Sequence, residues 1–422
     1  MLTFWTFTQI IKTLLVPTLE ITAIGVVAAI STSCGSEKKD SIHVTDVKLD
    51  KYSKTLFIDD TEILIPTVLP ENATDKSVTW SSTNTSVATV SNGTITAVAK
   101  GTATITVTTY DGGHTATCDV VVTIKPHVVI TANSDSTLTL KNNGENNPNL
   151  QYSIDGANWT TYGSTLNIPQ GQTLYLKGNN PDGWSSSDSV YSYLSITGDV
   201  SISGNVMGLI DNGTNTKFYI PCSYCFYDLF FESTGITSVD EDFLPATSLT
   251  THCYRNMFFG CSSLTTAPEL PAIALADYCY ECMFQNCSSL TNAPALPATD
   301  LTNWCYASMF NGCSSLTTVP NLPATTLADG CYAFMFSNCT SLIVAPDLIS
   351  KNLANECYNY IFFYCTSLAT IKISYTGEYN DEYFNSWVNN VAESGIFYYN
   401  GDQTAQDFGL PSGWAKKNIN LV

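Results

Sequence analysis

The second half of the chain repeats one motif every 26 residues. Its consensus is Cys-Tyr-x-x-Met-Phe-x-x-Cys-x-Ser-Leu, and a weaker copy begins at Cys225, with Ser233 in place of the second cysteine. The full copies carry their cysteines at Cys253 and Cys261, Cys279 and Cys287, Cys305 and Cys313, Cys331 and Cys339, and Cys357 and Cys365. A fixed period of roughly 20–50 residues is typical of a solenoid, in which each repeat buries its apolar face only against its neighbours. We therefore expect a repeat array over residues 208–373 and a C-terminal cap over residues 374–422.

Within one repeat, apolar residues recur every four positions. Leu327, Cys331, Met335 and Cys339 would line one face of a helix about three turns long. A short strand is expected over residues 341–344, because Pro346 then ends it. The sequence thus predicts coils of one helix and one strand, as in an α/β leucine-rich-repeat solenoid. The spacing of Met-Phe-x-x-Cys-x-Ser-Leu resembles the BspA-type leucine-rich repeats of bacterial surface proteins, and this resemblance implies a curved solenoid and adhesion to host matrix or to other cells.

Residues 44–125 carry short runs in which apolar residues alternate with Thr or Ser, the pattern of strands with one buried face. Asn92-Gly93 and Lys100-Gly101 supply turns between these runs. Trp80, the Ser86-Val87-Ala88 step, Gly93 and the turn over residues 99–103 also resemble the group-two bacterial immunoglobulin-like domain. That resemblance implies a β-sandwich that acts as a stalk or an adhesive spacer.

Residues 126–207 give further hairpin signals and predict a second, small β-rich module. Its Trp159, Tyr162 and Trp184 are either exposed platforms that stack on sugars or core residues of a small β-domain. The fold class we expect is therefore multidomain: an immunoglobulin-like β-sandwich, a second small β-rich domain, and an α/β leucine-rich-repeat solenoid with 26-residue repeats.

The N-terminus predicts export. The apolar, small-residue run Ile21–Ser33 ends at Cys34, and a polar stretch follows. This resembles a lipoprotein signal peptide over residues 1–33, with Cys34 acylated and residues 34–43 forming the anchor and tether. The alternatives are an ordinary secretory signal and an N-terminal membrane anchor. We expect a monomeric protein held at the bacterial outer membrane or cell surface by its lipid alone.

The charge and the motifs exclude several functions. A net charge of −20, with only 17 lysines and arginines, argues against nucleic-acid binding. The four histidines, His43, His114, His127 and His252, lie far apart in the sequence, and no catalytic or phosphate-binding motif is present. We therefore expect neither an enzyme nor a cofactor.

The 15 cysteines raise the question of disulfide bonds or metal. The two cysteines of one repeat would lie roughly 12 Å apart along a helix, whereas a disulfide needs Cα atoms within about 7 Å. We therefore expect buried free thiols, unless the second cysteine lies beyond the helix end. Cys222 with Cys225, and Cys279 with Cys282, have the Cys-x-x-Cys spacing of zinc and redox sites, but no histidine completes either, so we expect no metal and an exposed free thiol at Cys282.

Ligand contacts are expected at the repeat positions that vary, because the fixed positions hold the stack together. The candidates are His252, Tyr278, Trp304 and Glu356, which precede the first cysteine, and Glu269, Asn321 and Asp347, which follow the proline. Tyr278 and Trp304 are either an exposed aromatic hot spot or packing at the helix start. The sequence predicts a surface protein that binds a host or microbial protein or glycan, with carbohydrate capture by residues 126–207, through Trp159 and Trp184, as the alternative.

Overall fold

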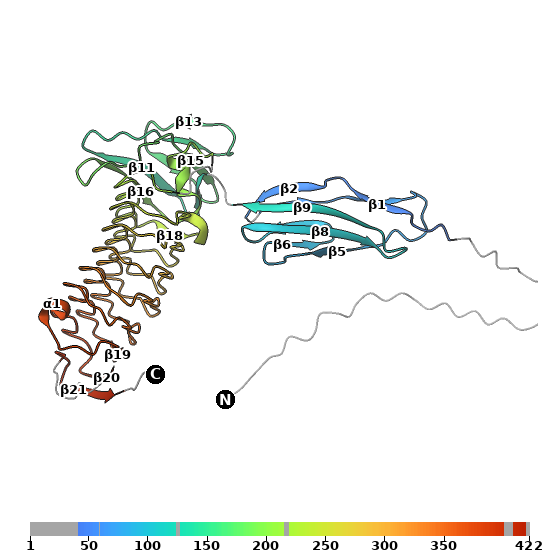
Figure 1. Cartoon of the computed structure of the whole chain (residues 1–422). Helices are drawn as coiled ribbons and strands as arrows, with labels where there is room; N and C mark the ends of the chain where they lie inside the picture. Colours follow the sequence, from blue (N-terminus) through green and yellow to red (C-terminus); the bar gives the residue numbers. More distant parts are fainter. Residues whose placement is uncertain (1–40, 59, 124–126, 215–218, 401–407, 419–422) are drawn as a thin grey trace, which may run out of the picture.

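A computed structural model describes residues 41–58, 60–123, 127–214, 219–400 and 408–418. Their buried apolar side chains form two separate cores, one over residues 44–122 and one over residues 128–414. Figure 1 shows the two parts of the backbone that enclose these cores. Cys34 and the expected signal peptide lie outside the described residues. Within the described ranges, no helix has the length and apolar character needed to cross a membrane.

The first core belongs to a β-sandwich. Its strands are β1 (Asp46–Leu49), β2 (Ser53–Phe57), β3 (Thr61–Ile63), β4 (Pro66–Leu69), β5 (Val78–Ser82), β6 (Ala88–Ser91), β7 (Thr94–Ala97), β8 (Gly101–Thr109) and β9 (Thr115–Thr123). They form sheets in the orders β2-β9-β8-β5, β3-β7-β6 and β1-β4. Asn92 and Gly93 join β6 to β7 with φ angles of 49° and 81°, and a Cβ on Gly93 would lie 2.7 Å from the Leu64 carbonyl oxygen. The turn therefore requires glycine at this position.

The second core begins with another β-sandwich. Its strands are β10 (Val128–Ala132), β11 (Ser136–Asn143), β12 (Gln151–Ser153), β13 (Thr160–Thr161), β14 (Leu166–Ile168), β15 (Thr173–Lys177), β16 (Tyr191–Thr197) and β17 (Val200–Gly204). One sheet has the order β14-β11-β16 and the other the order β13-β12-β15-β10-β17-β18. Strand β18 (Ile236–Val239) already belongs to the weak first repeat and pairs in parallel with β17. The 3₁₀ helices η1 (Val206–Leu209) and η2 (Glu241–Phe243) flank it, so the module continues into the repeats without a break in the core.

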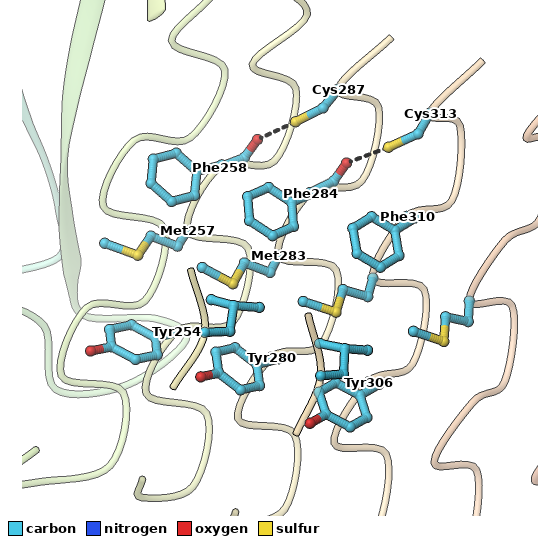
Figure 2. Close-up of a cluster of buried hydrophobic side chains, with 14 of the residues drawn as sticks. Tyr254, Met257, Phe258, Tyr280, Met283, Phe284, Cys287, Tyr306, Phe310 and Cys313 are labelled. Atoms are coloured by element: carbon cyan, nitrogen blue, oxygen red, sulfur yellow. Dashed lines mark hydrogen bonds between the residues drawn. The ribbon is translucent and has the colours of Figure 1, made fainter. Parts of the chain in front are cut away.

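Each full repeat is a coil of consecutive turns. In the coil that begins at Cys253, residues 253–254, 257–258 and 261 are buried, whereas residues 255–256 and 259–260 face outward and are half-buried. Figure 2 shows how the buried tyrosines, methionines and phenylalanines of successive coils form parallel rows. The Tyr254 and Tyr280 rings stack at 5.8 Å, and the Phe258 and Phe284 rings stack at 5.6 Å. The core of the array is thus a set of columns of identical residues.

Backbone amides in a coil alternate between two kinds of partner. The Cys253 amide donates to the Thr250 carbonyl of its own coil at 3.2 Å, and the next amide, Tyr254, donates to the Cys279 carbonyl of the following coil at 3.0 Å. In an α-helix every amide would donate to the carbonyl four residues earlier. The α/β leucine-rich-repeat solenoid is therefore the wrong fold class. Among the described residues the only α-helix is α1 (Asp381–Phe384), which lies in the tail.

The reason for this error is the backbone conformation of every fourth residue. His252, Asn256 and Gly260 have φ angles of 57°, 56° and 70°, and the corresponding residues of the later coils are left-handed as well. A left-handed residue with a side chain costs roughly 1–2 kcal/mol, and the hydrogen bonds to the next coil offset that cost. A four-residue turn unit repeats with the same period as one face of a helix, so apolar spacing alone does not separate the two structures.

The opposite arm of most coils is extended and pairs with the neighbouring coil through isolated parallel bridges. These bridges join Ser238 to Thr266, Asn292 to Thr318, Val344 to Thr370, Ser248 to Ala274, Thr326 to Asn352 and Leu348 to Ile373. The strand expected over residues 341–344 is thus reduced to one bridge at Val344.

The tail continues the stack beyond the last repeat. Strand β19 (Thr370–Lys372) of the last repeat forms a parallel sheet with β20 (Ser394–Tyr399) and β21 (Gly413–Asn418) of the tail, in that order. The outgoing amides of the last coil donate to tail carbonyls, as Tyr358 does to Tyr383 at 3.0 Å and Phe362 does to Trp387 at 2.9 Å. Every coil donates toward the C-terminus, and the tail supplies the final acceptors.

Candidate functional site

The paired alternation of buried and outward residues gives each coil one surface made of varying residues. We call this surface the turn face. It consists of the residue directly before the first cysteine of each repeat and of the residues two, three, six and seven positions after that cysteine. The left-handed backbone at every fourth position turns these side chains outward. Because the buried positions repeat and these do not, the turn face is where coils differ chemically.

The residues before the first cysteine stack into a ladder. Tyr224 and His252 lie 4.4 Å apart, His252 and Tyr278 4.7 Å, and Tyr278 and Trp304 6.3 Å, with the rings within 6° of parallel. All four rings are half-buried. Their faces are occupied by one another, so the ladder presents ring edges to solvent. The predicted candidates His252, Tyr278 and Trp304 are thus brought together, but as packing partners.

Gly330 follows Trp304 in the same column. A Cβ on Gly330 would lie 2.5 Å from the Trp304 ring, and its φ is 59°. The absence of a side chain therefore lets the next coil cover the last ring of the ladder. Glu356, the remaining candidate of this column, is half-buried one coil further on.

The second predicted column lies outside the turn face. Glu269, Asn321 and Asp347 are exposed on the return segments, each after a buried proline. Asp347 forms an ion pair with Lys372. These residues are exposed, but they lie on a different surface from the turn face. The two predicted columns therefore do not form one site.

An aromatic cluster that the sequence analysis missed lies on the turn face of the last two repeats. The Phe334 and Tyr360 rings stack at 4.6 Å, Phe363 contacts Tyr360 edge-on at 5.4 Å, and Tyr364 contacts Phe363 edge-on at 4.6 Å. Tyr364 is 46% exposed, and the other three are half-buried. The signal was present in the sequence, since positions three and seven after the first cysteine vary as strongly as the position before it.

A charged group occupies the turn face of the first repeats. Arg255, the only arginine of the chain, places Nε 2.7 Å from Glu281 Oε2, and its guanidinium lies 5.9 Å from the Tyr227 ring centre. Burial raises the pKa of Glu281, while Arg255 opposes that shift. Burial raises the pKa of neighbouring Asp228 to about 6, against the lowering effects of a hydrogen bond from Asn256 and of Arg255. One cation thus lies close to two carboxyl groups, the buried one of Asp228 and the half-buried one of Glu281.

The cysteines of the two repeat columns are free thiols and are buried. The expectation of buried thiols is confirmed. The second-column thiols donate to backbone carbonyls of earlier coils: Cys287 Sγ lies 3.1 Å from the Phe258 oxygen and Cys313 Sγ lies 3.1 Å from the Phe284 oxygen, each 29 residues earlier (Figure 2). In the weak repeat, Ser233 Oγ donates in the same way to the Leu194 carbonyl at 2.6 Å. The second cysteine therefore satisfies a buried carbonyl.

Cys282 is half-buried, so the expectation of an exposed thiol is wrong. Burial raises its pKa to about 12, with the Glu281 carboxyl adding to the effect. Within the described part of the chain, no group of three metal-ligating side chains gathers around a common point.

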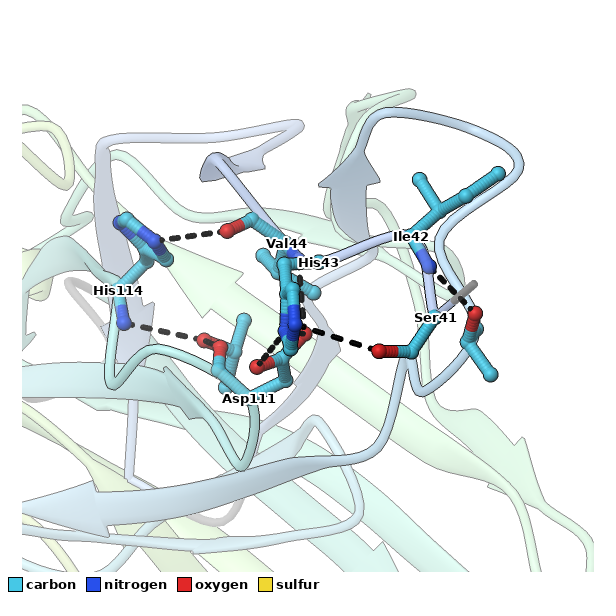
Figure 3. A network of polar contacts seen from close by, with 8 residues as sticks. Ser41, Ile42, His43, Val44, Asp111 and His114 are labelled. Carbon is cyan, nitrogen blue, oxygen red and sulfur yellow. Dashed lines mark hydrogen bonds and ion pairs between the residues drawn. The ribbon is translucent and has the colours of Figure 1, made fainter. Parts of the chain in front are cut away.

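Two histidines far apart in sequence meet at the edge of the first sandwich (Figure 3). His43 Nδ1 lies 3.0 Å from Asp111 Oδ1, His43 Nε2 lies 3.3 Å from Ser41 Oγ, and His114 Nε2 lies 3.1 Å from the Val44 carbonyl oxygen. The order Ser-His-Asp is that of a catalytic triad, and the His43 side chain is 73% exposed. We infer that these hydrogen bonds hold residues 41–44 against the turn between β8 and β9.

The two tryptophans of the module are not free platforms. Trp184 is fully buried and its Nε1 donates to the Ser192 carbonyl at 2.9 Å, so its proposed stacking on sugars is wrong. The Trp159 ring packs against His127 at 4.7 Å and under Lys177 Nζ at 4.3 Å. The Tyr162 hydroxyl accepts a hydrogen bond from the Leu140 amide at 2.8 Å.

The fold of residues 44–123, two main sheets around one core, is that of an immunoglobulin-like sandwich. A family model of the bacterial Ig-like domain (group 2) matches residues 43–120, and this part of the chain is such a domain. The predicted resemblance is confirmed for this segment.

Several curated proteins are similar to part of the chain. An uncharacterized protein of Clostridium acetobutylicum is 46% identical over 80 residues, 18% of this chain and 20% of that protein. An alpha-L-arabinofuranosidase of Bifidobacterium longum is 49% identical over 73 residues, 17% of this chain and 7% of that protein. An Ig-like virion protein of Serratia phage KSP90 is 40% identical over 83 residues, 19% of this chain and 32% of that protein. The matched segments thus span less than a third of each of these relatives.

Proposed function

We propose that this chain is an exported surface protein that binds a protein ligand, without catalysis, through the aromatic cluster of its turn face. The observation that carries the proposal is the contiguous group Phe334, Tyr360, Phe363 and Tyr364 on the outward side of the last two repeats. Aromatic side chains dominate the energetics of protein interfaces because they bury a large area at little conformational cost. The immunoglobulin-like domain would act as a spacer.

Two properties of the cluster support recognition rather than internal packing. Its rings contact one another partly edge-on, so ring faces stay open to a ligand, in contrast to the closed ladder from Tyr224 to Trp304. Tyr364 keeps nearly half of its surface exposed next to the half-buried Phe363. A rigid, partly desolvated aromatic patch of this kind loses little entropy on binding.

The spacer role draws on the comparisons. Proteins named as an arabinofuranosidase and as a virion protein share similar segments with this chain. A segment found beside such different functions fits a role in presentation. We further propose that the mature chain is held at the bacterial surface by acylation of Cys34. Labelling with a tagged fatty acid should mark the wild-type protein and not Cys34→Ser, whereas an ordinary secretory signal would leave both unlabelled.

The binding proposal is tested on the full chain with immobilised fibronectin, laminin, collagen and mucin as probes. The double variant Phe363→Ala and Tyr364→Ala should bind at least tenfold more weakly to whichever immobilised protein the wild-type chain binds. The matched control replaces Ile343 and Val344 with Ala, because these side chains are 59% and 53% exposed on the opposite arm of a neighbouring coil. Equal loss in both double variants, or none in the first, contradicts the proposal.

A further inference from the structure

A groove opens in the second sandwich where one strand stops short. Strand β14 pairs only with Ser136–Leu138 of β11, so the second half of β11 has no strand beside it on that edge. There the Tyr162 hydroxyl takes the place of a strand and accepts a hydrogen bond from the Leu140 amide at 2.8 Å. The resulting cavity has a volume of about 660 Å³ and lies between β11, the loop before β12 and the connection from β13 to β14. Its size is that of a small-molecule site.

The lining of this groove is polar and uncharged. The chain has 37 acidic and 17 basic residues, yet among the described residues no Asp, Glu, Lys, Arg or His lines the groove. Its polar side chains include the amides of Asn142, Asn147 and Asn149 and the hydroxyls of Thr161, Ser164 and Thr165, which are exposed, together with the half-buried Thr139. Leu140, Pro148 and the Tyr162 ring add apolar surface between them. A charged ligand would lose hydration here without gaining a counter-charge, whereas a ligand with many neutral hydroxyls and apolar C–H faces meets both kinds of partner.

Several of these polar groups are held in place before any ligand arrives. The Asn149 Oδ1 accepts from the Asn179 amide at 3.2 Å, and the Asn142 Oδ1 accepts from Ser192 Oγ at 2.8 Å. With these oxygens engaged by the protein, the polar group that each of the two side chains has left for a ligand is its NH₂ donor. The Thr139 and Thr165 hydroxyls also bond each other at 2.9 Å. Fixed donors reduce the entropy lost on binding.

We propose that this groove binds a neutral oligosaccharide. Sugar hydroxyls accept hydrogen bonds from the Asn142 and Asn149 amides and exchange them with the Thr161 and Ser164 hydroxyls, while a pyranose ring lies against Tyr162 and Pro148. The site is independent of the aromatic cluster on the turn face and of Trp159 and Trp184. It gives the module a ligand class of its own.

The test is isothermal titration of the full chain with cellohexaose, maltohexaose, mannohexaose and xylohexaose, with hexagalacturonate as the charged counterpart. At least one neutral hexaose should bind, hexagalacturonate should not, and the affinity should not change between low and high salt. Ser164→Trp, which fills the groove from an exposed position, should weaken binding at least tenfold. Gln170→Trp adds the same side chain at an exposed turn of the same module outside the groove and should bind as the wild type does.

Three outcomes overturn the proposal: no neutral hexaose binds, hexagalacturonate binds as well as the neutral sugars, or Ser164→Trp retains full affinity. The far-ultraviolet circular dichroism and melting temperature of Ser164→Trp should match those of the wild type, which shows that the loss is local. Phe363→Ala with Tyr364→Ala should leave saccharide binding unchanged, so failure of the turn-face proposal is distinguished from failure of this one.

Discussion

Arg255 Nε lies 2.7 Å from Glu281 Oε2, and this pair joins two adjacent coils across the turn face. Asp228, one coil earlier, is 3% exposed and has the same arginine as its source of positive charge. The chain has no other arginine, so two carboxyl groups in a region of low dielectric share one permanent cation. The ionisation of Asp228 is therefore unfavourable in the folded protein.

Replacing Asp228 with Asn should stabilise the protein at neutral pH. The folded pKa of about 6 is raised above the unfolded value, so the folded state binds the proton more tightly and the stability that Asp228 contributes falls as pH rises from about 4 to 6. Chemical denaturation should give Asp228→Asn an advantage of about 3 kcal/mol at pH 7.5 that shrinks toward zero near pH 4. A variant less stable than wild type at pH 7.5 would show that the ionised carboxyl is stabilising.

The second cysteine column should depend on its hydrogen bond as well as on its volume. Cys287→Ser keeps a donor near the Phe258 carbonyl, as Ser233 does for Leu194, whereas Cys287→Ala leaves that carbonyl unpaired and opens a small void. The serine variant should be more stable than the alanine variant by about 1 kcal/mol. Urea denaturation of the two variants checks this, and equal stability would mean that the thiol only fills space.

The left-handed residues should favour glycine over alanine. Ser308 has a φ of 55° on the half-buried turn face. Ser308→Gly should be more stable than Ser308→Ala by about 1 kcal/mol, because glycine adopts this conformation without a Cβ penalty. At Ala307, whose φ is not positive, the replacement by Gly should instead destabilise. Thermal unfolding measures both comparisons. If glycine were more stable than alanine at both positions, or less stable at both, the result would contradict the alternating backbone conformation.

Gly330→Ala should destabilise more than strain alone explains, because the new methyl group meets the Trp304 ring at 2.5 Å. Gly171 is the control: its φ is 80°, and a Cβ there meets nothing within 4 Å. We expect Gly330→Ala to exceed Gly171→Ala by about 1–3 kcal/mol in free energy of unfolding. Adding Trp304→Ala to Gly330→Ala should then cost little more, since the clash and the ladder contact are lost together. Full additivity would show that the two residues do not touch.

The sequence predicted which residues are buried more accurately than it predicted the backbone structure that buries them. The alternation in residues 44–125 identified the first sandwich, because strand period and turn glycines are local signals. The repeat period located the buried columns, including the thiols. It could not reveal that alternate amides bond the following coil, since that partner is 25 residues away, nor that Tyr278 and Trp304 adopt left-handed backbone, which bulky residues rarely do.

The candidate site could be predicted only in part, because the repeat period gives positions along the chain and not contacts between coils. The ladder residues were identified as a column, but only coordinates show that each ring covers the next, so replacing Tyr278 and Trp304 is now expected to lower the melting temperature. The aromatic cluster was missed because its rings come from positions three, six and seven after the cysteine and gather only when two coils are stacked. The groove could not be foreseen, because it depends on how far β14 extends along β11.

On the turn-face arm of the array, the outgoing amides of each repeat donate to carbonyls of the next repeat and the tail accepts the last set, whereas on the opposite arm amides such as those of Thr265 and Thr317 donate back to the preceding coil. A coil therefore offers its neighbours the same donors and acceptors whatever its place in the row. Recombination between near-identical copies could insert or delete 26 residues at a time and leave both ends of the array unchanged. Such events would alter the reach of the protein and the number of outward positions in a single genetic step, so array length is a trait that selection can adjust without redesigning the fold.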